Sequence, residues 1–172
     1  VITTMTTYTK IMWKGDNQLA QTPPEVWEPL KEEFGELFDP CPMEPEVDGL
    51  SIPWSGDQWN YVNPPYDSCQ AWLQKCAMEF IHDRKIVALI PCRTNTNWWF
   101  NWVLPYATEI RFIKNGVKFV GYKRKSPFPV ALVVYDPEKK GQQIFKGIDF
   151  YPKTKIGQPP KKKLKQNLKP EL

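Results

Sequence analysis

The clearest pattern in the chain is a helical repeat of apolar residues framed by two apolar segments. The repeat comprises Trp72, Leu73, Cys76, Ala77 and Phe80. Asp67 and Ser68 precede it as candidate caps, so a helix of about four turns is predicted. QWNYV (58–62) before it is aromatic and β-branched, and KIVALI (85–90) after it is nearly all apolar. The order strand, helix, strand predicts a parallel pair with a right-handed crossover.

A second, shorter helix is predicted upstream of this unit. TPPEVWEPLKEEFG offers Thr22 as the N-cap, Pro23 in the first turn and Gly35 as the terminating residue. ELFD (36–39) then predicts a short buried strand, and a proline-rich loop follows from residue 40 to residue 53. The first strand of the predicted sheet therefore lies upstream of the strand, helix and strand described above.

Downstream of this unit, the pattern predicts antiparallel strands at one edge of the sheet. TNWWFNWVL (96–104) indicates a short aromatic helix. EIRFIKNGVKFVG (109–121) places Asn115 and Gly116 between two alternating segments, a strong hairpin signal. PVALVVYD (129–136) is expected to close the sheet. The resulting prediction is a three-layer α/β fold, parallel at its centre, with an antiparallel hairpin at the C-terminal edge of the sheet.

Composition and charge indicate how the chain is divided into a folded domain and its terminal segments. A chain of 172 residues that is 41% apolar and 14% aromatic can form one compact domain. Residues 153–172 hold seven lysines and one glutamate and so carry a formal charge of +6. Because the net charge of the whole chain is +4, residues 1–152 carry +4 − 6 = −2. We therefore expect an N-terminal extension (1–20), a folded domain (21–152) and a basic, flexible tail (153–172). The tail can hold a polyanion or only aid solubility.

Several functional classes are disfavoured. No apolar run reaches membrane-spanning length and no signal peptide is evident, so we expect an intracellular, soluble protein without a membrane partner. The four cysteines have no CxxC spacing, and His82 is the only histidine. We therefore expect reduced thiols, no metal site and no histidine-dependent mechanism.

The chemistry is expected at one rim of the sheet. Asp39, Asn63 and Pro91 each follow or end a predicted strand, and ligands of such sheets bind outside the carboxyl ends of the strands. Asn63 opens the motif NPPY, in which Pro64 and Pro65 lack backbone N–H groups and have a fixed φ. The motif therefore predicts a rigid turn that exposes carbonyl oxygens beside the Asn63 side-chain carbonyl.

Two rigid acceptors suit one reaction in particular. The exocyclic amino group of adenine is a poor nucleophile because its lone pair is delocalised into the ring. Accepting two hydrogen bonds from that group localises the pair, so that it can attack a sulfonium methyl without a strong base. Tyr66 would supply a flat face for an extruded base. The motif taken alone is also compatible with an ordinary strand-to-helix turn.

Motifs in order along residues 21–136 resemble the phage-type DNA N6-adenine methyltransferases, a short Dam-like family. The matching stretches are TP at 22, EFGELFDPCP from 33, DGL from 48, NPPY from 63, ALIPCRTNT from 88, EIRFI from 109 and PFP from 127. The resemblance implies a Rossmann-like S-adenosylmethionine-dependent fold, reduced in size. It also implies a protein that works in the cytoplasm of a bacterial host or is encoded by a phage or virus. FDPCP lacks the glycine-rich turn of the wider superfamily, as the phage-type family does.

The resemblance also implies roles for individual residues. A carboxylate at Asp39 would face the ammonium group of S-adenosylmethionine. The implied cofactor-binding residues are Thr22, Pro23, Asp39, Pro40, Cys41 and Asn63. The implied catalytic residues are Asn63, Pro64, Pro65 and Tyr66. The implied substrate-binding residues are Tyr66, Arg93, Lys118, Lys123 and Arg124, with duplex DNA carrying a flipped adenine as the partner.

Other functions stay open on the sequence. The basic residues near the predicted hairpin fit phosphate contacts or a solvated sheet edge equally well. A catalytically silent nucleic-acid-binding domain that kept the fold is one alternative to an active methyltransferase. Related motifs also serve enzymes that methylate RNA adenine or glutamine side chains, of which glutamine is disfavoured by the basic tail. The sequence does not indicate the oligomeric state.

Overall fold

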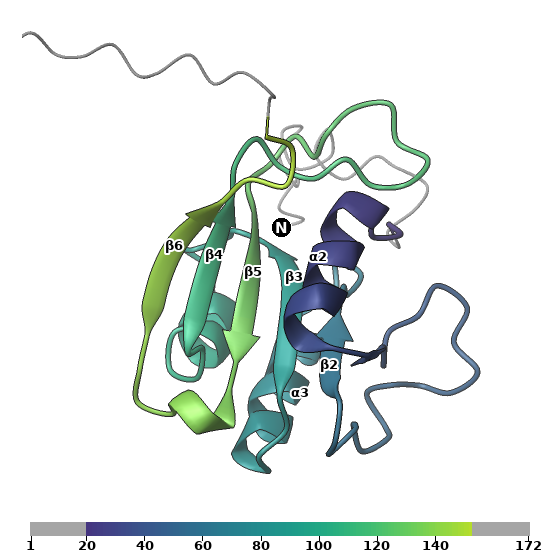
Figure 1. Ribbon diagram of the computed structural model, residues 1–172. Helices are drawn as coiled ribbons and strands as arrows, with labels where there is room; N and C mark the ends of the chain where they lie inside the picture. Colours follow the sequence, from purple (N-terminus) through teal and green to yellow (C-terminus); the bar gives the residue numbers. More distant parts are fainter. Residues whose placement is uncertain (1–19, 153–172) are drawn as a thin grey trace, which may run out of the picture.

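The computed structural model describes residues 20–152 (Figure 1). The predicted tail and residues 1–19 of the predicted extension lie outside the described residues. The helices are α2 (Pro24–Phe34), α3 (Cys69–Ile81), the π-helix η1 (Trp99–Val103) and the 3₁₀ turn η2 (Pro137–Lys139). The strands are β1 (Leu37–Phe38), β2 (Trp59–Val62), β3 (Ile86–Pro91), β4 (Glu109–Ile113), β5 (Val130–Tyr135) and β6 (Ile144–Ile148).

The six strands form one mixed sheet in the order β1-β2-β3-β5-β4-β6. β1, β2 and β3 are parallel neighbours, as predicted, and β5 runs antiparallel to both β3 and β4. β6 pairs parallel to β4 at the far edge. The predicted fold class, a mixed α/β sheet with antiparallel pairing toward its C-terminal edge, is confirmed.

The helices cover both faces of this sheet, which gives three layers (Figure 1). On one face, Val26 and Leu30 of α2 share a core cluster with Val87 and Leu89 of β3. On the other face, α3 and η1 pack against the alternate residues of β3, including Ala88. Every residue of β3 is buried. The continuous apolar run KIVALI thus forms a strand covered on both sides.

The predicted hairpin differs from the observed one. Asn115 and Gly116 do turn the chain, with φ of 60° and 69°. However, residues 117–121 form no strand, and the antiparallel partner of β4 is β5. The backbone N–H of Lys118 donates to the Tyr151 hydroxyl, and that of Val120 donates to the Gln21 carbonyl. These backbone groups bond to other segments, so they cannot pair with β4.

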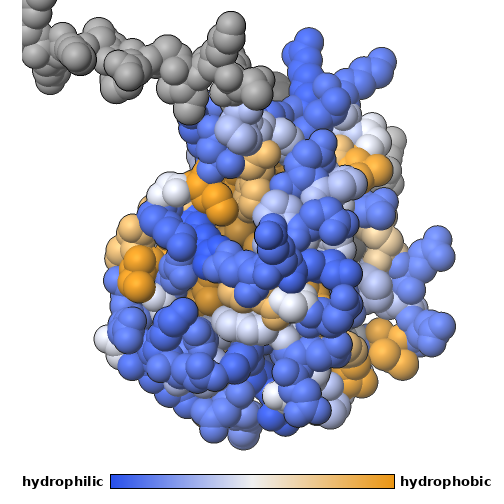
Figure 2. Space-filling view, viewed as in Figure 1, coloured by the Kyte–Doolittle hydropathy of each residue, from blue (hydrophilic) through white to orange (hydrophobic). Residues whose placement is uncertain are grey.

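The β6 edge was not predicted, because its residues show no alternation and most are exposed. Ile144 and Phe145 of β6 are exposed hydrophobic residues, as are Met43 and Val47 in the segment between β1 and β2. Figure 2 shows hydrophobic surface over both of these places, on a face that is otherwise largely hydrophilic. Within residues 20–152, no helix has the length and hydrophobicity needed to span a bilayer.

Candidate functional site

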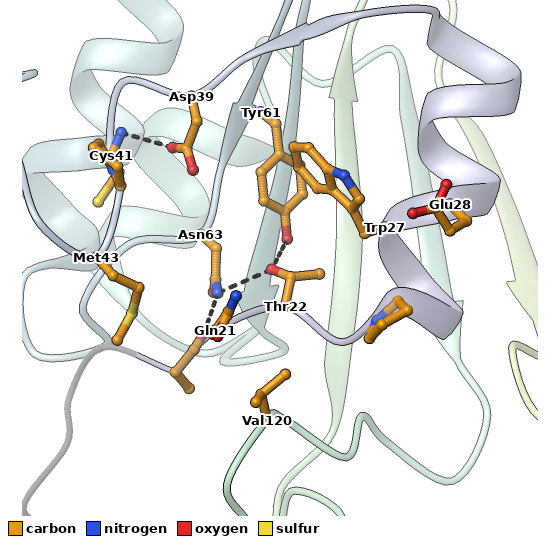
Figure 3. Close-up of a pocket in the computed structure, with 13 residues that line it drawn as sticks. Gln21, Thr22, Trp27, Glu28, Asp39, Cys41, Met43, Tyr61, Asn63 and Val120 are labelled. Carbon is orange, nitrogen blue, oxygen red and sulfur yellow. Dashed lines mark hydrogen bonds between the residues drawn. The ribbon is translucent and has the colours of Figure 1, made fainter.

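A pocket of about 670 Å³ lies where β1 and β2 end, within the usual size range of small-molecule sites. Figure 3 shows Asp39, Cys41 and Met43 on one side and Trp27 and Glu28 of α2 on the other. The remaining lining residues are Ala20, Gln21, Thr22, Pro24, Pro42, Tyr61, Asn63 and Val120. The pocket therefore lies at the predicted rim beside Asp39 and Asn63, whereas Pro91, the third residue expected there, does not line it.

Asp39 follows β1 and is partly buried in the pocket wall. Its Oδ1 accepts a hydrogen bond from the backbone N–H of Cys41 at 2.8 Å. Burial raises the pKa of the Asp39 carboxyl to about 6, although the bond from Cys41 opposes the shift. Within residues 20–152, no side chain forms an ion pair with this carboxylate in the pocket.

Asn63 follows β2 on the same rim, and its amide is held in one orientation (Figure 3). Its Nδ2 donates to the backbone carbonyl of Ala20 at 2.6 Å and to the hydroxyl of Thr22 at 3.3 Å. An amide nitrogen has two hydrogens, and both are engaged by these bonds. The remaining polar atom of the side chain is Oδ1, which can only accept.

Thr22 was predicted as the N-cap of the first helix, and this prediction is wrong. The cap position belongs to Pro23, and no side chain caps the helix there. The Thr22 hydroxyl instead contacts the hydroxyl of Tyr61 at 2.5 Å and accepts from Asn63. Gly35 does end the helix, with φ of 80°. Thr22 therefore links β2 to the segment before α2 and orients the Asn63 amide.

The two prolines of the motif do not behave alike. The Pro65 carbonyl accepts from the backbone N–H and the hydroxyl of Ser68, at 3.0 and 3.2 Å, and so begins the turn into α3. Our expectation that both prolines expose free carbonyl oxygens is therefore wrong for Pro65. The Pro64 carbonyl has no hydrogen-bond partner among residues 20–152. Asn63 Oδ1 and the Pro64 carbonyl are thus two acceptors of the motif that no donor within residues 20–152 occupies.

Tyr66 does not line the pocket. Its ring meets Phe119 and Phe128 edge to face, with centroids 6.2 and 5.5 Å apart. Its hydroxyl is buried and has no hydrogen-bond partner among the described residues, and burial raises the pKa of this phenol well above its usual value. The ring that was predicted to stack on a base therefore packs against the segment between β4 and β5.

That segment, residues 114–129, also carries the predicted basic residues. Lys118, Lys123 and Arg124 are exposed, and none of them lines the pocket. Val120, between them, does line it. Arg93 follows β3 and lies elsewhere on the rim, where its charge partly opposes the burial that raises the pKa of Cys69 to about 12. The basic side chains thus lie on a segment that borders the pocket without entering it.

Of the residues predicted to bind a cofactor, the pocket brings together Thr22, Asp39, Cys41 and Asn63. Pro23 and Pro40 are buried beside it. Sequence analysis missed Tyr61 and Trp27, whose rings meet edge to face at 5.1 Å. Tyr61 could have been predicted from the sequence, because residues two apart along a strand point to the same face and Tyr61 lies two positions before Asn63. Trp27 had none beyond its proximity to Thr22 and Pro23.

Comparison with known protein families identifies the family of this chain. A family model described as DNA N-6-adenine-methyltransferase (Dam) matches residues 11–129, more than half of the chain. The matched region includes every residue that lines the pocket and ends immediately before β5. Searches of curated proteins and of solved structures found no significant match.

Proposed function

The chain belongs to the DNA N-6-adenine-methyltransferase (Dam) family, and from this membership we propose that it transfers the methyl group of S-adenosylmethionine to N6 of an adenine in duplex DNA. An enzyme of this family acts on the adenine amino group in DNA. The identity of the methyl donor, the roles of the pocket residues and the extrusion of the base are the parts that we propose.

The observation that carries the proposal is the pair of acceptors at the start of the NPPY motif. Asn63 Oδ1 is left as an acceptor because Nδ2 donates to Ala20 and Thr22. The Pro64 carbonyl is left as a second acceptor because Pro65, and not Pro64, accepts from Ser68. Two acceptors take both hydrogens of an amino group, which favours the tetrahedral nitrogen that attacks a methyl group.

The pocket residues fit S-adenosylmethionine. Bound there, this molecule supplies an electrophilic methyl group on a sulfonium sulfur. Asp39 and Glu28 offer carboxylates to a ligand that carries sulfonium and ammonium charges. Asp39 is a strong candidate for the ammonium group, because a cation beside it would relieve the unfavourable burial that raises its pKa to about 6. Trp27 offers an aromatic surface to the adenine ring of the cofactor.

The DNA side of the proposal rests on the segment between β4 and β5. Lys118, Lys123 and Arg124 are exposed cations on a segment that reaches the pocket at Val120. Contacts from them to phosphates would orient the duplex without reading its sequence. Tyr66 contacts the same segment and is our candidate for stacking on the extruded adenine.

The decisive experiment measures the product. The protein is incubated with adenine-containing duplex DNA and methyl-labelled S-adenosylmethionine, and the digested nucleosides are analysed by mass spectrometry for N6-methyladenine. We expect Asn63→Ala to remove at least 99% of turnover, since a single positioned hydrogen-bonding group is worth about 10²- to 10³-fold. Asn101→Ala, an exposed asparagine in η1, is the matched control and should retain activity.

Other outcomes separate the alternatives. Methylation of RNA but not of DNA would preserve the chemistry and replace the substrate. Absence of calorimetric heat and of thermal stabilisation at millimolar S-adenosylmethionine, with and without DNA, would favour the silent nucleic-acid-binding domain. Full activity of Asn63→Ala would reject the assigned mechanism.

A salt titration tests the proposed phosphate contacts. Replacing both Lys123 and Arg124 by alanine should reduce the slope of log affinity against log salt by about 2, because each phosphate contact contributes about 0.9. Replacing Lys85 and Lys139, which form ion pairs on the surface near η2, is the matched charge control and should leave the slope nearly unchanged. Equal slopes for all three proteins would remove this segment from the DNA interface.

A further inference from the structure

The segment between β1 and β2 contains a point at which two stretches of backbone meet. A Cβ atom placed on Gly49 would lie 1.8 Å from the Pro40 carbonyl oxygen and 2.8 Å from its carbon. It would also lie 3.0 Å from Cη2 of Trp72 in α3. Because the closest atoms belong to the backbone, no rotation of a side chain could make room. Only glycine fits between Pro40 and Trp72.

Hydrogen bonds on both sides hold Gly49 at this point. Asp48 Oδ1 accepts from the backbone N–H of Leu50 at 3.0 Å, and the Asp48 carbonyl accepts from the backbone N–H of Ser51 at 2.9 Å. The Gly49 carbonyl accepts from the indole Nε1 of Trp54 at 2.8 Å. Trp54 is buried and stacks on Trp72, with ring centroids 6.3 Å apart. The tryptophan pair thus anchors Gly49 to the core cluster under α3.

The residue that Gly49 contacts lies inside the turn that lines the pocket. Pro40 stands between Asp39 and Cys41, and the bond from the Cys41 N–H to Asp39 Oδ1 closes the turn. Asp39 and Cys41 both line the pocket, whereas Pro40 is buried behind them. A displacement of the Pro40 carbonyl would therefore move the Asp39 carboxylate and the bond that orients it.

We propose that Gly49 is a positioning residue for the methyl donor: its close contact with Pro40 holds the Asp39–Cys41 turn so that the carboxylate faces a cationic ligand in the pocket. The inference rests on the proposed function for the identity of that ligand. Its structural part, the control of the Asp39 turn by Gly49, stands on the contacts alone. It assigns a physical reason to the DGL motif, which otherwise lies outside the site.

The first test compares two glycines of the same segment. Gly49→Ala should weaken S-adenosylmethionine binding in calorimetry by about tenfold and raise KM similarly, with little change in kcat at saturating cofactor, because a small misplacement of a binding group is costly. Gly56→Ala is the matched control, since its Cβ would meet only the tip of the Arg84 side chain, at 3.1 Å. Equal affinities for Gly49→Ala, Gly56→Ala and the unmodified protein would overturn the proposal.

A second variant covers the case in which Gly49→Ala does not fold. Trp54→Phe keeps an aromatic ring in the core but removes the hydrogen bond to the Gly49 carbonyl. We expect a smaller loss of cofactor affinity in the same direction, about threefold, the fold-change expected for roughly half of an average hydrogen bond. A folded Trp54→Phe protein with unchanged affinity would count against the proposal.

A third readout needs no cofactor and separates this inference from the proposed function. The Asp39 carboxyl can be titrated by NMR in protein labelled at aspartate side chains. If Gly49 holds the turn, the pKa of Asp39 should fall from about 6 toward its ordinary value in Gly49→Ala and Trp54→Phe, because the displaced carboxyl meets water. An unchanged titration would reject the positioning role. Failure of the unmodified protein to bind S-adenosylmethionine would reject the proposed function alone.

Discussion

Two carboxylates toward opposite edges of the sheet, one partly buried and one fully buried, meet very different surroundings. Asp39 follows β1 at the pocket, accepts one backbone hydrogen bond, and has its pKa raised to about 6 by burial. Glu109 begins β4 at the other end, where Arg111 and Lys146 contact it at 2.8 and 2.5 Å. Burial alone would raise the pKa of Glu109, but hydrogen bonds from these two cations hold it below its usual value.

The difference separates a carboxylate that stabilises the fold from one that is available to a ligand. Arg111 also donates to both carboxylate oxygens of Glu33 at the end of α2, so the Glu109 cluster joins α2, β4 and β6. Removing one member of such a cluster leaves buried charge uncompensated. At the pocket, no cation within the described part of the chain pairs with the Asp39 carboxylate, and burying it there costs stability until a cationic ligand binds. Four substitutions or titrations test this contrast.

The largest effect is expected from breaking the compensated cluster. Glu109→Gln should lower the free energy of unfolding by about 3 kcal/mol, because it leaves Arg111 and Lys146 without their shared carboxylate in a largely buried site. Chemical denaturation at neutral pH measures this loss. Glu138→Gln, which breaks the exposed pair with Lys85, is the control and should change stability little. Equal stabilities for the two variants would contradict the contrast.

The opposite effect on stability is expected from neutralising Asp39, which has no ion-pair partner within residues 20–152. A rise of the pKa from 3.8 to about 6 corresponds to about 3 kcal/mol, at about 1.4 kcal/mol per pKa unit. Because Asp39 is only partly buried and solvent screens its charge, Asp39→Asn should raise the free energy of unfolding at pH 7.5 by about 2 kcal/mol. The folded state binds the Asp39 proton more tightly than the unfolded state, so this group favours folding below pH 4. That contribution is lost as the pH rises through 6. The gain should therefore be absent at pH 3.5, and a destabilised variant at pH 7.5 would refute the assignment.

A third test titrates the same carboxylate through binding. Below its pKa of about 6, Asp39 becomes neutral, so the affinity for S-adenosylmethionine should fall about tenfold between pH 7 and pH 5. Calorimetry at several pH values gives the profile. In Asp39→Asn the affinity should be lower and nearly independent of pH across this range. A parallel profile in both proteins would show that another group controls binding.

The smallest effect concerns a neutral group that also lacks a partner. Tyr66→Phe removes a buried hydroxyl that has no hydrogen-bond partner among residues 20–152, and should raise the free energy of unfolding by about 1 kcal/mol while keeping the ring for stacking. Tyr135→Phe is the matched control, because the Tyr135 hydroxyl donates to the Trp102 carbonyl and its loss should destabilise the protein. Thermal denaturation shows whether each variant is more or less stable than the unmodified protein. A destabilised Tyr66→Phe would indicate that the Tyr66 hydroxyl has a hydrogen-bond partner in solution.

Sequence patterns identified most of the elements that build the pocket. The strands ending near Asp39 and Asn63, the helix after the motif and the buried strand β3 follow from local periodicity and from turn residues. The resemblance to the DNA N6-adenine methyltransferases, confirmed by the family match, came from motifs in a fixed order. These features depend on residues close together in the chain, which is why a single sequence reveals them.

The tertiary structure decided which backbone groups pair across long separations. Val117 and Phe119 are buried in alternation, as the hairpin pattern requires, yet they pack into the α2 side of the core instead of joining β4. Thr22 looked like a helix cap, but it bonds Tyr61 and Asn63, which are 39 and 41 residues away. The local sequence pattern indicates that a residue will be buried or hydrogen-bonded, but it does not identify the partner.

The sequence by itself determined the parallel β1–β3 unit, the NPPY turn and the family. Only the folded chain decided which groups within residues 20–152 find partners. The Pro65 carbonyl accepts hydrogen bonds and the Pro64 carbonyl does not, Glu109 is paired with cations and Asp39 is not, and Gly49 lies against the Pro40 carbonyl. Each of these depends on which distant group occupies the adjoining space. Free acceptors and unpaired charges are properties of packing, so they arise only when the segments meet.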